Sequence, residues 1–238
     1  YLKRKADAYL NAWKSDPNRS PLIIKGPRQV GKTETIDYFA AHNYRSVVEI
    51  NFVEEPKYRA ITADGYGADT IVRNISLIDP AKKFIQGDTL IFFDEIQAHP
   101  DIATALKFFK IDGKYDVICS GSMLGISYKQ IESNSVGYKT DYEMRSLDFE
   151  EFLWARGYDE AVIESMFTHL CDATPFSEVE MNVFSTAFMD YCVLGGMPAV
   201  VASHIRTGTF EGTLQLQRQL ILDYQEDIRK YAQGLDQA

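Results

Sequence analysis

The segment from Gly26 to Thr33 reads GPRQVGKT, and it constrains the fold of this chain more than any other stretch. Its spacing fits G-x-x-x-x-G-K-[ST], the pattern of a phosphate-binding loop. Residues 22–24 form an apolar run before it, and residues 34–41 have a helical pattern after it. This is the strand–loop–helix context that the motif requires. The sequence therefore predicts a loop that wraps around phosphate groups between a strand and a helix.

The chemistry of such a loop assigns roles to its residues. Glycine at positions 26 and 31 lets the backbone approach an anion closely, and the following helix N-terminus favours negative charge. Lys32 is expected to reach the β- and γ-phosphates, and the Thr33 hydroxyl to bind magnesium. The residues predicted to bind the nucleotide are Gly26, Pro27, Arg28, Gln29, Val30, Gly31, Lys32, Thr33 and Glu34.

A second motif follows the apolar run at residues 89–93, which reads as a short buried strand and continues into Asp94 and Glu95. An apolar strand that delivers a carboxylate beside the loop is the usual partner of this motif. We expect Asp94 to hold magnesium, directly or through water, and Glu95 to act as the general base for an attacking water. The alternative is an Asp-Glu pair that caps a helix after a buried strand.

A further strand is predicted over residues 115–119, next to the strand that leads into the phosphate loop. It ends in the cluster Ser120-Gly121-Ser122. Ser120 or Ser122 could hydrogen-bond the γ-phosphate or the lytic water, and we take Ser120 as the candidate catalytic residue. A Ser-Gly-Ser turn that solvates the strand end is the alternative.

Strands alternate with helices through residue 146, which predicts an α/β fold with a parallel sheet covered on both faces. Everything after Asp148 has a helical pattern. We therefore predict a three-layer nucleotide-binding core over residues 1–146 and a smaller, all-helical lid lobe over residues 147–238. A helix is expected over residues 2–13, with Arg4 on its polar face.

The composition restricts the partners. A net charge of −9 over 238 residues argues against a sequence-independent grip on nucleic acid. No apolar run approaches the ~20 residues that span a bilayer. The three cysteines, Cys119, Cys171 and Cys192, lack metal-ligand spacing, so we expect buried or free thiols in a reducing, cytoplasmic compartment.

Five stretches together resemble the AAA superfamily of ATPases: PLIIKGPRQVGKTETI, TLIFFDEIQ, ICSGSMLG, SLDFEEFL and YCVLGGMPAVV. They look most like the bacterial and archaeal AAA proteins that carry a C-terminal domain of unknown function. The resemblance implies an ATP-binding core with a helical lid, and ATP and Mg²⁺ as ligands. It also implies that a C-terminal domain follows, so we expect this chain to be part of a longer protein. A protein partner and an oligomer are both compatible with it.

The resemblance places Ser120 at the first sensor position, where many relatives have Asn. Gly137, Tyr138 and Lys139 stand where relatives often carry a Gly-Arg pair, so an arginine finger is not expected there. Arg28 and Arg145 are the remaining candidates for cationic help. For the second sensor the candidates are Arg206, Arg218 and Arg229.

The function expected from these residues is MgATP binding and hydrolysis to ADP and phosphate, which would move the lid and a partner domain. The alternative is a nucleotide-gated switch with slow or no hydrolysis, in which occupancy controls binding to a protein partner. A kinase is a more remote alternative, because it also uses a phosphate loop.

Overall fold

The computed structural model describes residues 1–122 and 137–232 of the chain. They form two compact units. The sheet unit consists of Ala6–Arg28 and Lys32–Met144. The helical unit consists of Tyr1–Lys5, Gln29–Gly31 and the chain from Arg145 onward. The domain boundary predicted at residue 146 stays a prediction.

The sheet unit contains a five-stranded sheet with the order β2-β3-β4-β1-β5. All four strand pairs are parallel, as the alternation of strands and helices predicted. The strand that ends in the serine cluster lies next to the strand before the phosphate loop, also as predicted. The strands are β1 (Leu22–Gly26), β2 (Ser46–Asn51), β3 (Thr89–Asp94), β4 (Asp116–Ser122) and β5 (Thr140–Glu143).

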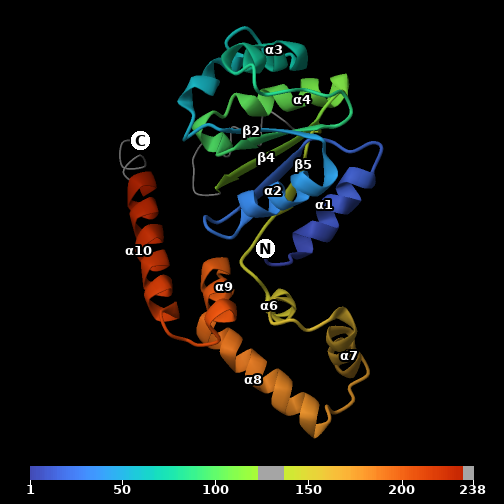
Figure 1. Ribbon diagram of the computed structural model, residues 1–238, viewed down its shortest axis with the longest axis vertical. Coiled ribbons are helices and arrows are strands. Elements are labelled where there is room, and N and C mark those ends of the chain that lie inside the picture. The colour runs from blue at the N-terminus through green and yellow to red at the C-terminus, as the bar shows by residue number, and fades with distance from the viewer. Residues whose placement is uncertain (123–136, 233–238) are drawn as a thin grey trace. The chain divides into compact units, whose positions relative to one another are not determined.

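Helices cover both faces of this sheet (Figure 1). Side chains alternate between the faces of a strand, so Ile91 and Phe93 of β3 pack toward α3 and α4 while Leu90 and Phe92 point the other way. All six residues of β3 are buried, as expected for an inner parallel strand. The helices of this unit are α1 (Lys5–Ser15), α2 (Lys32–Asn43), α3 (Ala68–Ile78) and α4 (Ile102–Asp112), with short 3-10 helices η1 (Pro56–Thr62) and η2 (Ile96–Ala98).

The helical unit has no strand among its described residues. Its first helix begins with a capping box. The Asp148 carboxylate accepts from the Glu151 backbone N–H, and the Glu151 carboxylate accepts from the Asp148 backbone N–H. A second capping box, from Ser177 and Glu180, starts α8. The helices are α6 (Phe149–Ala155), α7 (Glu160–Cys171), α8 (Glu178–Leu194), α9 (Pro198–Thr207) and α10 (Thr213–Ala232).

One prediction about the N-terminus is wrong. The first helix begins at Lys5, not at residue 2, and Arg4 is only 4% exposed instead of lying on a solvated face. Contacts with distant parts of the chain override the local helical pattern there. Residues 125–131, whose sequence pattern is ambiguous, lie outside the described residues. Across the described parts of the chain, no helix is long and apolar enough to cross a membrane.

Candidate nucleotide-binding site

The predicted phosphate loop connects the end of β1 at Gly26 to the start of α2 at Lys32. Gly26 is required by a close approach, because a Cβ there would lie 2.0 Å from the Met144 carbonyl oxygen. Gly31 has a φ of +89° and Gln29 a φ of +61°, which is unusual for a residue with a side chain. The loop therefore has the tight, partly left-handed backbone that directs successive N–H groups toward an anion.

The Lys32 side chain folds back onto the backbone of the phosphate loop. Its ammonium donates to the carbonyl oxygens of Gly26 at 3.1 Å and Pro27 at 2.6 Å, and the residue is only 8% exposed. Burial lowers the pKa of Lys32, while the carboxylates of Glu95 and Asp94 act in the opposite direction. A phosphate near this amine would supply a further negative partner and restore part of the lost solvation.

Asp94 is the centre of a polar cluster in the sheet unit, and it is 4% exposed. Its Oδ2 accepts from the Thr33 hydroxyl at 3.1 Å and lies 3.4 Å from the Asn51 amide nitrogen. Its Oδ1 accepts from the Ser120 hydroxyl and from the Glu95 backbone N–H. The register that pairs Phe93 with Cys119 places Asp94, at the end of β3, next to Ser120 of β4 on one sheet face.

The donor set fits magnesium. Two oxygen ligands at right angles in an octahedral site with ~2.1 Å bonds lie about 3.0 Å apart. Thr33 Oγ1 and Asp94 Oδ2, which a hydrogen bond joins at 3.1 Å, are close enough to serve one such ion together. In the described chain no group of three His, Cys, Asp or Glu residues forms a metal site. Magnesium at a phosphate loop needs no such group, because phosphate oxygens and water complete its shell.

Glu95 follows β3 with a φ of +53°, so its backbone is left-handed. Gln97 in the next turn holds its carboxylate, with the amide nitrogen donating to Glu95 Oε2. The other end of the same amide accepts from the Ser122 backbone N–H at 3.3 Å. Gln97 thus connects the candidate base to the end of β4. The sequence reasoning missed this residue, although it stands in the TLIFFDEIQ stretch.

Three further predicted residues, Ser120, Arg28 and Glu34, differ in their surroundings. Ser120 is fully buried with its hydroxyl on Asp94, and Arg28 is half-buried with its charge acting on Lys32. The Glu34 side chain is exposed in the first turn of α2. In the stretch where relatives often carry a Gly-Arg pair, the Lys139 ammonium pairs with the Asp141 carboxylate at 2.5 Å.

Two more carboxylates act on this cluster. Burial raises the pKa of Asp37 on α2, and the charges of Asp94 and Glu34 raise it further. Burial likewise raises the pKa of Glu49 on β2, with Asp37 and Asp94 adding to it. The Asp94 charge therefore repels two neighbouring carboxylates. A divalent cation would relieve this repulsion.

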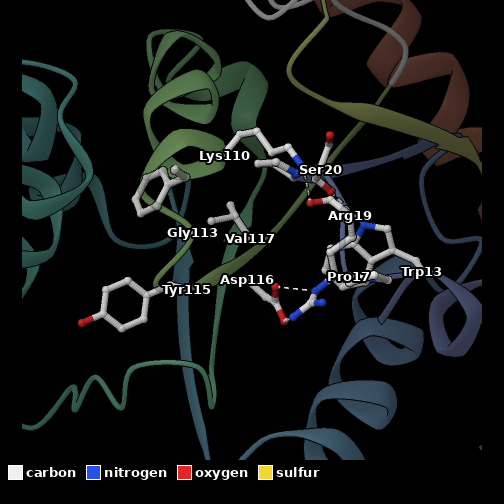
Figure 2. Close-up of a pocket in the computed structure, with 11 residues that line it drawn as sticks. Trp13, Pro17, Arg19, Ser20, Lys110, Gly113, Tyr115, Asp116 and Val117 are labelled. Carbon is white, nitrogen blue, oxygen red and sulfur yellow. Dashed lines mark hydrogen bonds and ion pairs between the residues drawn. The ribbon is translucent and has the colours of Figure 1, made fainter. Parts of the chain in front are cut away.

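A hollow of about 130 Å³ lies at the amino ends of β1 and β4, whereas the phosphate loop follows the carboxyl end of β1 (Figure 2). Its charged groups are already paired: Arg19 donates to both oxygens of Asp116, at 2.7 and 2.9 Å, and the Tyr44 hydroxyl donates to Asp116 at 2.8 Å. Lys110 donates to the backbone oxygen of Arg19. We therefore interpret this hollow as a structural junction and not as the nucleotide site.

Comparison with known proteins agrees with the α/β fold. Residues 18–153 match a family described as the AAA domain. No curated protein sequence matches the chain. Among solved structures, the Walker-type ATPase PABY2304 of Pyrococcus abyssi matches with a TM-score of 0.55 and 14% identity, over 97% of this chain and 76% of that one. C. elegans PCH-2 matches with a TM-score of 0.39 and 11% identity, over 73% and 48% of the two chains.

The family match spans more than half of the chain and includes the phosphate loop, Asp94, Glu95 and the serine cluster. At 14% identity, the likeness to the Pyrococcus protein shows the fold alone, a parallel α/β sheet of the phosphate-loop type. The chain belongs to the AAA domain family, within the AAA superfamily of nucleotide-binding ATPases.

Proposed function

We propose that this protein binds MgATP at the phosphate loop and hydrolyses it to ADP and phosphate. The observation that carries the proposal is the contact between Thr33 and Asp94. A hydroxyl at the end of the loop lies 3.1 Å from a carboxylate at the end of β3, at a spacing suited to one magnesium ion.

The residues of the loop would bind the triphosphate. Backbone N–H groups of the loop and of the first turn of α2 would donate to phosphate oxygens, and Lys32 would exchange its two carbonyl partners for them. Thr33 and Asp94 would hold magnesium, with Asn51 and Ser120 fixing the carboxylate. The metal would supply charge neutralisation on the phosphates.

Glu95 would take a proton from the attacking water while the water oxygen forms its bond to the γ-phosphorus and the bond to ADP breaks. Gln97 keeps the carboxylate in a fixed orientation, which favours this role. Ser120 would act as the first sensor through Asp94, on which its hydroxyl lies.

The tip of the loop, residues Gln29–Gly31, belongs to the helical unit. Gln29 donates to Asp223 of α10 at 3.0 Å, within that unit. A phosphate that orders the tip would therefore act on α10 and the lid. We further propose that the lid moves a partner domain. We also propose a cytoplasmic location, which is in keeping with the exposed free thiols of Cys171 and Cys192.

A slow, nucleotide-gated switch is the second candidate. The stretch Gly137-Tyr138-Lys139 has no arginine, and its Lys139 is bound by Asp141. Binding to a partner protein measured with ATP, with ADP and without nucleotide would separate the two functions. Equal affinities in all three states would exclude the switch.

Steady-state phosphate release by the wild type and by Glu95→Gln tests hydrolysis. The amide keeps the size of the side chain but cannot accept the proton. We expect the variant to retain ATP binding and to lose at least ~100-fold in kcat. Equal rates in the two proteins, both near background, would exclude hydrolysis at this site.

A further inference from the structure

Arg4 lies in the short segment before α1, and its guanidinium is buried by parts of the chain that are far apart in the sequence. Nη1 donates to the carbonyl oxygen of Val30 at 2.7 Å, and Nη2 donates to that of Arg145 at 2.6 Å. Nε lies 3.2 Å from a carboxylate oxygen of Glu151. All four residues belong to the helical unit. Arg4 thus binds the tip of the phosphate loop, the segment before α6 and α6 itself.

The contact with Val30 controls the orientation of the next peptide group. In a planar trans peptide the C=O and the following N–H point in opposite directions. Fixing the Val30 carbonyl on Arg4 therefore turns the Gly31 N–H away from Arg4. Gly31 completes this geometry with its left-handed φ of +89°, which residues with a Cβ avoid. The Gly31 N–H is one of the loop donors that can reach a bound phosphate.

The position of Arg4 is itself fixed by Glu151. The same carboxylate accepts from the backbone N–H groups of Lys5 at 2.7 Å and Asp148 at 3.2 Å. The side chains of Arg4 and Glu151 are 5% and 6% exposed. Because Glu151 balances its charge at short range, Arg4 acts mainly through the direction of its hydrogen bonds. A lysine, which lacks the planar fork, cannot reproduce this set of bonds.

We propose that Arg4 is a positioning residue for nucleotide binding: it holds the Val30 carbonyl so that the Gly31 N–H is set for the phosphates. The inference rests on the proposed function. The inference goes beyond the proposed function because it gives the segment before α1 and the start of α6 a role in the shape of the phosphate loop.

The test compares Arg4→Lys with Arg19→Lys. Arg19 is a matched control because its guanidinium also donates two directed hydrogen bonds, in this case to Asp116 at the amino ends of the strands. The affinity for ATP is measured by calorimetry in the presence of Mg²⁺, and the melting temperature of each protein is measured alongside. We expect Arg4→Lys to weaken ATP binding by at least ~10-fold, the usual scale for hydrogen bonds to a charged group, and Arg19→Lys to leave it unchanged.

A purely structural role would lower the melting temperature of Arg4→Lys without changing the affinity of the folded protein. Wild-type affinity in Arg4→Lys, or an equal loss in Arg19→Lys, would overturn the proposal. If Arg4→Lys does not fold, the double variant Arg4→Met with Glu151→Gln replaces it, because it leaves no buried carboxylate unpaired, and the same outcomes apply. Absence of ATP binding by the folded wild type would instead overturn the proposed function.

Discussion

The Thr33 hydroxyl lies 3.1 Å from Asp94 Oδ2, although 61 residues separate the two in the sequence. Thr33 is the second residue of α2, which follows the phosphate loop, and Asp94 ends β3, which lies two strands away from β1 in the sheet. The contact exists because the carboxyl ends of parallel strands meet at one edge, where ligands of such sheets bind.

Replacing Thr33 by Ala removes one of the two candidate magnesium ligands. We expect the gain in ATP affinity on adding Mg²⁺ to fall by ~10-fold or more, while affinity without the metal stays close to wild type. Titrations with and without Mg²⁺ measure this. Thr35→Val is the control, because Thr35 is buried on the same helix. An equal gain in ATP affinity from Mg²⁺ in Thr33→Ala and in the wild type would contradict the assignment.

Gln97→Ala removes the amide that holds the Glu95 carboxylate. We expect kcat for ATP hydrolysis to fall by about 10- to 100-fold, since a hydrogen bond to a charged group contributes ~1.5–3 kcal/mol, and the dissociation constant of ATP to stay unchanged. Phosphate release and calorimetry give the two quantities. The exposed Gln86→Ala serves as control. A rise in the dissociation constant with an unchanged kcat would refute the positioning of Glu95 by Gln97.

His99 makes stability depend on pH. It is 8% exposed, its Nε2 lies 3.0 Å from the Thr62 hydroxyl, and burial lowers its pKa, with Arg59 lowering and Asp101 raising it. The unfolded chain, with a pKa of about 6.5 for His, binds a proton before the folded protein does. The free energy of unfolding should therefore fall as the pH decreases through this value, until the lowered pKa of the folded state is passed.

Chemical denaturation between pH 8 and pH 5 checks this, because His99→Gln should remove that part of the slope. His42→Gln, at an exposed position, should retain it. An unchanged slope in His99→Gln would show that other groups control the pH dependence.

Asp116 holds together the junction at the amino ends of β1 and β4. Arg19 donates to it there (Figure 2), and so does the Tyr44 hydroxyl. Asp116→Ala leaves both donors without this acceptor. We expect it to lower the free energy of unfolding by about 1–3 kcal/mol. ATP affinity should not change, because the junction lies away from the loop. A loss of ATP binding in the folded variant would contradict our interpretation of this hollow.

Much of this site could be predicted from the sequence, for physical reasons. The spacing of GPRQVGKT determines a loop that only a strand and a helix can flank, and the apolar run before Asp94 requires a buried strand. Two such strands in one parallel sheet bring their ends together, so the proximity of Thr33 and Asp94 follows. The position of Ser120 beside Asp94 follows from the adjacency of β3 and β4, which helix–strand alternation favours but does not determine.

The roles of Arg4 and Gln97 could not be predicted. Arg4 stands in a helical pattern, and its burial depends on Val30, Arg145 and Glu151, all distant in the sequence. Gln97 gains its role from the left-handed backbone of Glu95, which turns that carboxylate back toward the next residues. Hydrophobic periodicity reveals neither a tertiary contact nor an unusual φ of a non-glycine residue.

The most direct test of the central claim is calorimetric titration of the wild type and of Lys32→Ala with ATP and Mg²⁺. We predict saturable binding of one ATP per chain by the wild type, and a loss of at least ~10-fold in affinity in Lys32→Ala, because that amine is the loop's buried cation. Lys57→Ala, at an exposed position, should bind as the wild type does. Equal affinity in Lys32→Ala and wild type, or no binding by the folded wild type, would contradict the account.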